Sequence, residues 1–441
     1  MSPAKGLFLR FASLYPPVTF EETEAYLIGL GEHRIRLDLE PMRQLLAMFG
    51  RPDRKLTSVI VGGTNGKGST CAYLTAIGLE AGLRVGTFTS PHLESVTERI
   101  AMNGNPIEKN FFAQLATDTE QRLRNADFPS VTYFEFLTLL AVRVFVEQRT
   151  ELAIFEVGLG GRLDTTNALE RAVTILTPIA LDHTEILGST IEKIAAEKGA
   201  ILRQGIPAVT GKQPKNALAV LREFAKQVDA KLQIADLDYS VAGTPEDFRY
   251  ENNNERMDHL AVRLRGDHQM DNAACAIAAL RNVSNGRFTF SDRAIRQGLL
   301  NASAPARLER WISKEGQEIW LDVAHNPDAA RTIAHYFELH YLSPVDIVLG
   351  MLKDKDWRSV VDILTPIAGS FTFCRPASPR AWDLTEVQED APTSIPWSVR
   401  RDPLDALSFA LDRSDRVLCT GSFYILGAIR AELPKRNFEP S

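Results

Sequence analysis

The feature that most constrains the fold is a glycine-rich segment between an apolar strand and a helix. Residues 58–61 form a short β-branched run that predicts a buried strand, and the pattern of residues 69–81 predicts a helix. Between them stands Gly62-Gly-Thr-Asn-Gly-Lys-Gly-Ser69. Such a loop at the start of a helix can aim backbone N–H groups at phosphate oxygens. We therefore interpret it as a phosphate-binding loop whose Lys67 reaches the β- and γ-phosphates.

One position of this loop departs from the standard G-x-x-x-x-G-K-[ST] pattern. Gly68 separates Lys67 from Ser69. A glycine-rich turn with a surface lysine is the simpler alternative. The strand before the loop and the helix after it favour phosphate binding.

Strands and helices alternate along the first three hundred residues. Further strands are predicted at residues 84–89, 152–157 and 173–180, and helices at 132–147, 216–228 and 270–283. The capping-box spacing from Ser189 to Glu192 predicts another helix that runs to residue 201. The polar segment 243–258 is predicted to be a surface loop or hairpin connection. This alternation is typical of an α/β fold with a parallel-rich sheet.

The alternation restarts after the segment 301–305. Strands are predicted at 318–321, 345–349, 371–374 and 417–420, and helices at 327–339, 357–368, 403–413 and 423–432. We expect an ATP-binding domain of P-loop type at residues 1–302. A smaller Rossmann-like α/β domain is expected at residues 303–441.

Composition excludes several classes of protein. Fifty Lys and Arg against 56 Asp and Glu give a net charge of −6, which argues against a dedicated nucleic-acid binder. The four cysteines include no CxxC pair, so they predict reduced thiols rather than a zinc or redox site. Neither a signal-peptide core nor a run of about 18 uncharged apolar residues is found, so we expect a cytoplasmic protein without membrane segments.

Polar residues follow several of the predicted strands. Glu156 ends one strand, Asp182-His183 follows another, and Ser90-Pro-His92 follows a third. Ligands of parallel α/β sheets bind at the carboxyl ends of strands, where a carboxylate could hold Mg²⁺. Each residue taken alone could be a helix cap or a turn, but together they favour a site.

The second predicted domain has comparable strand ends. Asp322-Val-Ala-His-Asn-Pro327 and Gly421-Ser422 each lie between a predicted strand and a predicted helix. They could be plain helix caps, although two in one domain suggest a substrate-facing edge. Lys198, beside Glu197 in a predicted helix, would by default face solvent.

The motifs taken in order resemble one known family. They are Gly63-Thr-Asn-Gly-Lys-Gly-Ser69, Thr89-Ser-Pro-His92, Thr97-Glu-Arg-Ile100, Thr132-Tyr-Phe-Glu135, Glu156-Val-Gly-Leu-Gly-Gly-Arg-Leu-Asp164, Leu181-Asp-His183, Glu197-Lys198, Gly266-Asp-His-Gln269 with Asn272, Asp322-Val-Ala-His-Asn-Pro327 and Gly350-Met-Leu-Lys-Asp-Lys-Asp356. The chain resembles the folylpolyglutamate synthases of the Mur-ligase superfamily, in particular the bacterial bifunctional dihydrofolate synthase/folylpolyglutamate synthases. The resemblance runs from about Leu30 to Leu426.

The resemblance implies an ATP-dependent amide ligase that acts on small molecules. ATP would phosphorylate a carboxylate, and the amine of L-glutamate would attack the resulting acyl phosphate. The acceptors would be dihydropteroate and reduced folates. The implied protein is a cytoplasmic monomer with two Mg²⁺ sites and without nucleic-acid or membrane partners.

The resemblance also implies roles for individual residues. Ser90 and Glu156 would bind one Mg²⁺, His183 with Glu156 another, and Lys198 would be carbamylated. The implied catalytic residues are Lys67, His183, Lys198, Asp322 and His325. The implied nucleotide contacts are Gly63, Thr64, Asn65, Gly66, Lys67, Gly68, Ser69, Asn272, Arg307 and Asp322. The implied substrate contacts are Thr132, Tyr133, Phe134, Glu135, Leu163, Asp164 and Thr165, with His325 and Ser422 on the glutamate or phosphate side.

One segment departs from the family pattern. Arg34-Ile-Arg-Leu-Asp38 resembles the early pterin-contacting loop only loosely, and Arg36 stands where relatives commonly have an acidic residue. Different pterin contacts are therefore expected here.

Three alternatives stay open at the level of sequence. The first is a folylpolyglutamate synthase without the dihydrofolate synthase step, against which Thr132-Tyr-Phe-Glu135 argues. The second is a Mur-type cell-wall peptide ligase, against which Gly68 argues. The third is a nucleotide-dependent switch, which would not need the polar strand ends of the second domain.

Overall fold

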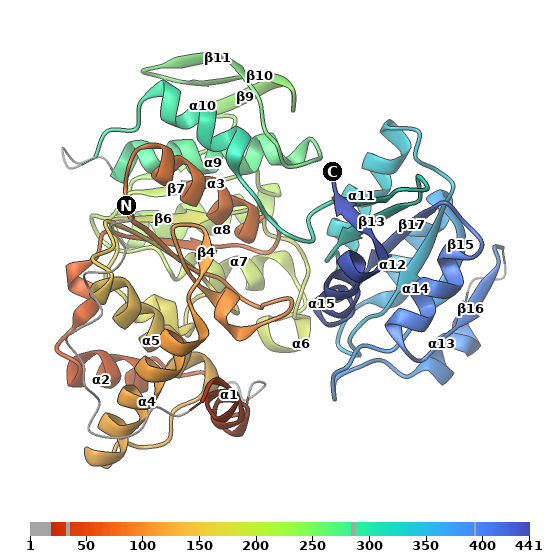
Figure 1. The fold of residues 1–441 in the computed structure, drawn as a ribbon. Coiled ribbons are helices and arrows are strands. Elements are labelled where there is room, and N and C mark those ends of the chain that lie inside the picture. The colour runs from red at the N-terminus through yellow and green to blue at the C-terminus, as the bar shows by residue number, and fades with distance from the viewer. Residues whose placement is uncertain (1–18, 32–35, 284–287, 392–393) are drawn as a thin grey trace, which may run out of the picture.

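The chain forms two bodies, each built on its own sheet (Figure 1). The computed structural model describes residues 19–31, 36–283, 288–391 and 394–441. The N-terminal residues, where no signal peptide is expected, and Arg34 of the early segment lie outside these ranges. No helix in the described part of the chain is long and apolar enough to cross a membrane.

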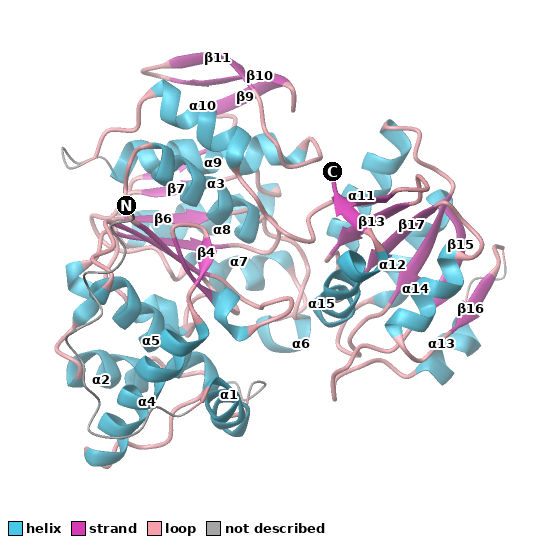
Figure 2. Cartoon of the chain, in the orientation of Figure 1, coloured by secondary structure: helices cyan, strands magenta, loops and turns pink. Residues whose placement is uncertain are grey.

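The strands of the first body's main sheet, magenta in Figure 2, pair mostly in parallel. Its described strands follow the order β4-β3-β2-β5-β1-β6-β7-β8. Only the pairings of β2 with β3 and of β3 with β4 are antiparallel. The bounds are β1 Ser58–Gly62, β2 Val85–Phe88, β3 Ile100–Met102, β4 Asn105–Pro106, β5 Leu152–Glu156, β6 Val173–Leu176, β7 Ala208–Thr210 and β8 Leu232–Ile234.

Helices cover both faces of this sheet (Figure 1). They are α1 Phe20–Gly29, α2 Glu40–Met48, α3 Lys67–Glu80, α4 Lys109–Asn125, α5 Tyr133–Glu147, α6 Thr184–Leu187, α7 Ile191–Gly199, α8 Lys215–Gln227, α9 His268–Val283 and α10 Asp292–Asn301. Neighbouring side chains of β1 point to opposite faces. Val59 and Val61 pack with the cluster of α3, α9 and α10, whereas Ile60 packs with that of α5. Burial on both faces explains the continuous apolar run of this strand.

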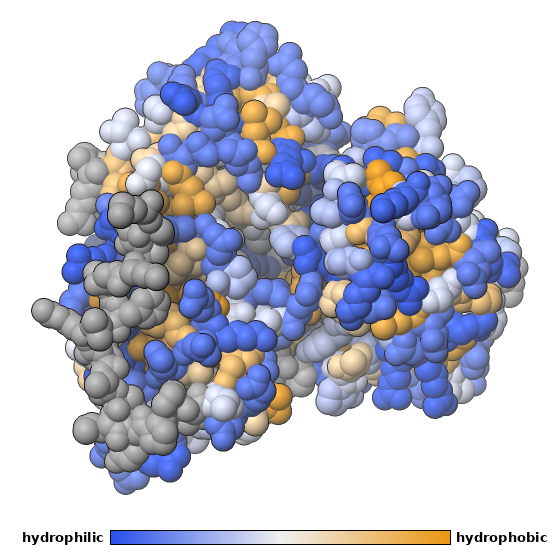
Figure 3. All heavy atoms as spheres, in the orientation of Figure 1, coloured by the Kyte–Doolittle hydropathy of each residue, from blue (hydrophilic) through white to orange (hydrophobic). Residues whose placement is uncertain are grey.

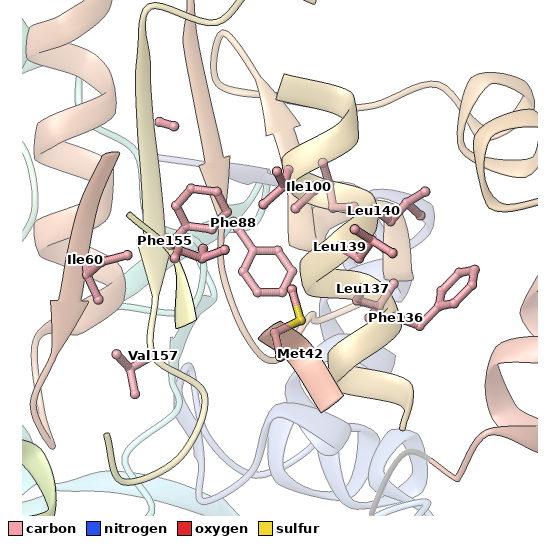
Figure 4. Packing of buried hydrophobic residues seen from close by; sticks show 14 of the residues in the cluster. Met42, Ile60, Phe88, Ile100, Phe136, Leu137, Leu139, Leu140, Phe155 and Val157 are labelled. Atoms are coloured by element: carbon pink, nitrogen blue, oxygen red, sulfur yellow. The ribbon is translucent and has the colours of Figure 1, made fainter. Parts of the chain in front are cut away.

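The α5 side of the sheet has an aromatic core, seen from close by in Figure 4. Phe88 of β2 and Phe155 of β5 have ring centroids 6.2 Å apart. They lie between the sheet and the α5 residues Phe136 and Leu140, with Met42 of α2 beside them. This core fixes the direction in which β2 and β5 end, and both ends carry predicted site residues.

The segment 243–258 is more ordered than a surface loop. It belongs to a three-stranded antiparallel sheet of β9 (Tyr239–Thr244), β10 (Asp247–Asn252) and β11 (Arg256–Leu260). Phe248, Tyr250 and Met257 face inward onto α9. Of the two predicted alternatives, the hairpin is confirmed and the surface loop is wrong, because these apolar residues alternate with polar ones, which is the pattern of a half-buried hairpin.

The second body contains a seven-stranded sheet in the order β16-β15-β14-β17-β13-β12-β18. The strands from β16 to β13 pair in parallel, and β12 pairs antiparallel with both of its neighbours, β13 and β18. The bounds are β12 Glu309–Ser313, β13 Glu318–Asp322, β14 Val345–Leu349, β15 Ala368–Phe373, β16 Trp397–Val399, β17 Arg416–Thr420 and β18 Phe438–Pro440, with helices α11 Pro327–Leu339, α12 Trp357–Leu364, α13 Leu384–Asp390, α14 Pro403–Leu411 and α15 Phe423–Glu432.

The start of α7 differs from its prediction. Thr190, not Ser189, is the N-cap of α7, and its hydroxyl accepts a hydrogen bond from the Lys193 amide. Both residues are good caps by type, so composition cannot choose between them. The helix ends at Gly199, two residues before the predicted end.

The chain passes from the first body to the second through residues 302–308. Ala302 belongs to the core under α10, and Ala306 belongs to the core of the second body. Ala306 and Leu308 both have positive φ, 55° and 46°. The expected division at residue 302 falls at the start of this connection.

Candidate active site between the two bodies

The phosphate loop lies where β1 ends and α3 begins, as its sequence predicts. Gly63 and Gly66 have φ of 131° and 87°, which other residues rarely adopt. A Cβ at Gly63 would lie 1.9 Å from the Thr177 hydroxyl, and one at Gly66 would lie 2.3 Å from the Asn272 side-chain oxygen. Glycine is therefore required at both positions, by conformation and by space.

Hydrogen bonds hold this loop against the end of β6. The amides of Thr64 and Asn65 donate to the carbonyl of Pro178, at 2.9 and 3.2 Å. The Thr64 hydroxyl donates to the carbonyl of Ala180. Lys67 folds back over the loop, with its Nζ 3.0 Å from the Thr64 carbonyl oxygen. Its ammonium thus lies on the side where phosphates would bind.

Glu156 and Ser90 meet at the ends of β5 and β2. The Ser90 amide donates to Glu156 Oε2 at 3.2 Å, and Glu156 is 5% exposed. Burial raises the pKa of Glu156, and the charge of Lys67 opposes that rise. A buried carboxylate that is costly to ionise gains from a divalent cation beside it.

Asp164 shapes the loop that follows β5. Its Oδ2 accepts hydrogen bonds from the amides of Gly158 and Leu159, and its Oδ1 accepts from the amide and hydroxyl of Thr166. Burial raises the pKa of Asp164, and these bonds oppose the rise. The residue therefore has a structural role in addition to any contact with substrate.

The start of α5 carries the other predicted substrate residues. Thr132 and Glu135 form a capping box, in which each side chain accepts from the other's amide. Phe134 packs on the backbone of Gly158, and its ring lies 5.6 Å from Phe88. Tyr133 is buried under the Arg99 guanidinium, at 5.0 Å. Two neighbours lie alongside, Thr165 in a hydroxyl contact with Thr138 and Leu163 half-buried in the loop after β5.

Arg36 joins this group through an ion pair. Its Nη1 lies 3.4 Å from Glu135 Oε2, and its Nη2 donates to the Ser130 carbonyl at 2.8 Å. The Glu135 carboxylate is 1% exposed, and its Oε1 is buried without a hydrogen-bond partner. An arginine at position 36 therefore neutralises a buried acid, which an acidic residue there would repel.

Lys198 does not face solvent. It is 6% exposed, and its Nζ donates to the carbonyl of Gly63 at 2.8 Å. Burial, with help from the charge of Lys67, lowers its pKa to about 7. The prediction of a solvated helical lysine was wrong because the face of α7 that carries Lys198 packs under the phosphate loop. The family resemblance, in contrast, had implied a carbamylated lysine at this position rather than a solvated one.

The connection between the bodies and the two helices behind it surround the other side of the loop. Arg307 Nη2 lies 3.5 Å from where a Cβ of Gly68 would be, and its guanidinium lies 5.5 Å from the Phe423 ring. Asn272 donates to Gln269, whose amide in turn donates to Ser69. These contacts bring two of the predicted nucleotide residues against the phosphate loop.

Asp322 ends β13 and receives two backbone hydrogen bonds. The amides of Leu308 and Ala324 donate to its carboxylate at 2.8 and 2.9 Å. Burial raises its pKa, and the charge of Arg307 opposes the rise. Ser422 caps α15 by accepting from the Tyr424 amide, so its hydroxyl is engaged as a helix cap.

The two bodies meet at Asp182. Its carboxylate oxygens lie 3.2 Å from His325 Nε2 and 2.5 Å from Lys355 Nζ. Burial opposes ionisation of Asp182, but His325 and Lys355 outweigh it and hold its pKa well below the usual range. His183 lies beside them, 3.4 Å from Lys355 Nζ, and burial lowers its pKa to about 3. A neutral imidazole is the form that binds a metal.

The predicted residues thus fall into two neighbouring groups. Lys67, Ser90, Glu156, Lys198 and Arg307 surround the phosphate loop. His183 and His325 belong to the second group, around Asp182. In the described residues, no three His, Cys, Asp or Glu side chains are close enough to hold a metal by themselves. Phosphate oxygens and water would have to complete a Mg²⁺ site, which is how this ion usually binds.

Sequence reasoning gave no role to Asp182, Lys355 or Asn326. All three stand in the motifs quoted above, so the signal was present. The Asn65 amide donates to Asp328 at 2.8 Å, and Asn326 donates back to Asn65 at 3.0 Å. Such pairs join residues more than 250 positions apart, and one sequence cannot reveal them.

A cavity and a groove lie between the bodies. The cavity, about 280 Å³, is bounded by the turn 266–268 and by the α11 residues Asp328, Arg331 and His335. A groove separates the two bodies on the face in Figure 3, where the surface is mostly hydrophilic. A ligand on the phosphate loop would touch both bodies, because Asp328 of α11 already touches Asn65.

Comparisons with known proteins agree with this architecture. Residues 61–280 match the Mur ligase middle domain, and residues 306–423 match the Mur ligase glutamate ligase domain. The two matches coincide with the two bodies. Fold and site together define a Mur-type, ATP-dependent ligase.

Individual relatives are more specific. The dihydrofolate synthase/folylpolyglutamate synthase of Bacillus subtilis (strain 168) is 34% identical over 431 residues, covering 94% of this chain and 99% of its own. Escherichia coli FolC in complex with DHPP and ADP superposes with a TM-score of 0.87 at 30% identity, covering 96% of this chain and 100% of its own. A bifunctional enzyme with Mn, AMPPNP and L-glutamate bound has a TM-score of 0.85 at 32% identity, covering 95% and 100%. The chain belongs to the dihydrofolate synthase/folylpolyglutamate synthase family of Mur ligases, in its bacterial bifunctional type.

Proposed function

We propose that the chain joins L-glutamate to dihydropteroate, which yields dihydrofolate, and to reduced folates, which yields folylpolyglutamates. The observation that carries this proposal is the meeting of two sets of residues. The phosphate loop with Lys67, Glu156 and Lys198 stands on one side, and the strand ends of the second body stand on the other. The relatives with bound DHPP, ADP and L-glutamate support the same substrates.

The reaction has two steps. A carboxylate oxygen of the acceptor attacks the γ-phosphorus of ATP, which gives an acyl phosphate and ADP. The amine of L-glutamate then attacks the acyl carbon, so that the amide bond forms, phosphate leaves and the amine loses a proton. Phosphorylation is needed because a free carboxylate is a poor electrophile.

The residues of this chain act mainly by charge and position. Lys67 offsets the negative charge that builds on the transferred phosphoryl group. Arg307 stands on the other side of the loop, and Asn272 and Asp322 would fix the nucleoside. The cavity between residues 266–268 and α11 would accept its base. His325 and Ser422 would lie toward the glutamate and the phosphate, and docking of the second body brings the amine to the acyl carbon.

We propose Ser90, Glu156 and His183 as protein ligands of Mg²⁺. The raised pKa of Glu156 and the neutral imidazole of His183 support this assignment. A bound divalent ion supplies charge neutralisation at the phosphates. Glu156 would supply the negative charge of this ligand set, and the Ser90 amide orients its carboxylate by a hydrogen bond.

We also propose that Lys198 is carbamylated. Carbamylation needs a neutral amine, and a pKa of about 7 supplies one near neutral pH. The product would be an anion beside Lys67, which removes the repulsion between the two lysines.

Three further assignments belong to this proposal. The first domain would comprise residues 1–302 and the second residues 303–441, with the connection 302–308 between them. The pterin half would bind near Phe134 and Asp164. The protein would act as a monomer in the cytoplasm.

The test is phosphate release by the purified protein with ATP, Mg²⁺ and L-glutamate, with and without dihydropteroate. Release that needs both glutamate and dihydropteroate is the expected result. Release only with tetrahydrofolate as acceptor would leave a folylpolyglutamate synthase and point to the Arg36–Glu135 pair as the cause. No release with either acceptor would refute the proposal.

A further inference from the structure

Asp182 of the first body makes several polar contacts with the second body. It lies after β6, close to the phosphate loop, and its carboxylate is 9% exposed. Its three partners across the interface are Lys355 Nζ at 2.5 Å, His325 Nε2 at 3.2 Å and Asn326 Nδ2 at 3.5 Å. One buried carboxylate therefore has three polar partners on the other body.

These partners come from two separate turns of the second body. His325 and Asn326 follow β13, whereas Lys355 lies in the turn after β14. Strand β17 stands between β13 and β14 in the sheet. Asp182 is therefore a common partner for two turns that the sheet alone does not bring together.

The pair with Lys355 is well shielded from solvent. The Lys355 side chain is 6% exposed. Shielding strengthens the attraction between the two charges, and loss of either charge would remove the charged partner of the other, which is costly for a buried ion. Removal of either charge should therefore weaken the contact between the two bodies.

Asp182 also orients the turn that carries His183. Its Oδ1 accepts from the His183 amide at 2.8 Å, and His183 has a φ of 49°. The same carboxylate therefore connects a candidate metal ligand with the docked position of the second body.

We propose that Asp182 is a positioning residue that sets the docked arrangement of the second body, so that His325 and Lys355 face the phosphate loop when glutamate arrives. The part that concerns glutamate rests on the proposed function. The part that concerns docking does not.

The test compares Asp182→Asn, Lys355→Gln and the double variant in the full-length protein. The control is Asp390→Asn, which breaks an exposed pair with Arg358 inside the second body. One readout is the radius of gyration from small-angle scattering without ligands. The other is the KM for L-glutamate against the KM for ATP in the phosphate-release assay.

We expect Asp182→Asn to increase the radius of gyration and to raise the KM for glutamate about tenfold or more, a size typical of coupling between sites. The KM for ATP should rise less than that for glutamate, because the phosphate loop keeps its contacts within the first body. Lys355→Gln should act in the same direction. The double variant should be scarcely worse than Asp182→Asn, since both changes remove one interaction.

The outcomes separate the two proposals. Unchanged scattering together with an unchanged KM for glutamate overturns the role of Asp182. Unchanged scattering with loss of ATP affinity also overturns it, because Asp182 would then only shape the His183 turn. The scattering of Asp182→Asn could change while the wild type shows no glutamate-dependent phosphate release. That result would support the docking role of Asp182 and refute the proposed function. If Asp182→Asn does not fold, Lys355→Gln, which leaves the His183 turn intact, decides.

Discussion

Lys198 donates a hydrogen bond to the carbonyl of Gly63 over 2.8 Å, so a buried lysine of α7 supports the first turn of the phosphate loop. The bond links α7 to the phosphate loop, and its two residues are 135 positions apart in the chain. Any chemical change at Lys198 must therefore be felt by the phosphate loop.

Carbamylation of Lys198 can be detected directly. With isotopically labelled bicarbonate, we expect one carbamate signal in the carbon NMR spectrum, and we expect it to fade as the pH falls below about 7, where the amine becomes protonated. Lys198→Arg should abolish the signal. Lys193→Arg, a change at an exposed position of the same helix, should keep it. A spectrum without the signal at pH 8 would refute the modification.

Glu156→Gln should separate activity from stability. The amide cannot replace the charge offered to a cation, so kcat should fall at least about a hundredfold, the size of a lost charge-stabilising contact. The melting temperature should not fall, because burial disfavours the ionised form of Glu156. Phosphate release, Mn²⁺ titration with AMPPNP and thermal melting check this. Glu151→Gln, a change beside the opposite end of β5, is the control, and undiminished Mn²⁺ affinity in Glu156→Gln would contradict the metal assignment.

His325→Gln tests the role of the second body in catalysis. We expect binding of ATP to persist, because His325 makes its contacts with Asp182 and the Val323 carbonyl rather than with the phosphate loop. Glutamate-dependent phosphate release should fall. Calorimetry with AMPPNP and the release assay measure the two effects. Full glutamate-dependent turnover in this variant would contradict the role that we give to the second body.

Gly427→Ala tests the packing of α15 against the first body. An added Cβ would lie 1.9 Å from the Leu93 carbonyl oxygen, so the helix or the loop must shift. Overpacking of this kind costs about 1–3 kcal/mol. Denaturant unfolding should show the loss, whereas Gly29→Ala, where nothing lies within 4 Å, should not. Equal stabilities would show that the two bodies pack less closely here.

Acid should destabilise the protein through buried neutral histidines. Burial lowers the pKa of His92 to about 4, from 6.5. Between these values the unfolded chain binds more protons than the folded one, so stability falls as the pH falls from 6.5 to 4. In melting curves across this range His92→Gln should flatten the dependence, and His259→Gln, at an exposed side chain, should not. Parallel curves for wild type and His92→Gln would refute the contribution of His92.

The sequence predicted most of the second body and the centre of the first. The bounds of α11, α15 and β14 agree with the prediction. The two helices show a clear periodicity of 3.6 residues and the strand a clear apolar run, each between distinct boundary residues. The hairpins β9–β11 were predicted only as an alternative to a loop, and the helix α4 was not predicted. Polar residues on their exposed faces obscured the periodicity.

The site was predicted in part for a different reason. Local motifs identified Lys67 and Glu156, since the strand–loop–helix order fixes where such residues stand. The environment of Lys198 depends on a helix that packs under a loop far away in sequence. The link from Asp182 to Lys355 depends on the docking of two bodies, for which a single sequence carries no local signal.

The connection between the bodies also brings a charged side chain close to the phosphate loop. Residue 307 stands between two left-handed residues, and its guanidinium reaches toward Gly68. If the second body turned about this connection, Arg307 would move with it, toward the phosphate loop or away from it. The connection between the bodies thus also carries the positive charge that we propose for the nucleotide, so an opening of the bodies for product release would withdraw this charge at the same time.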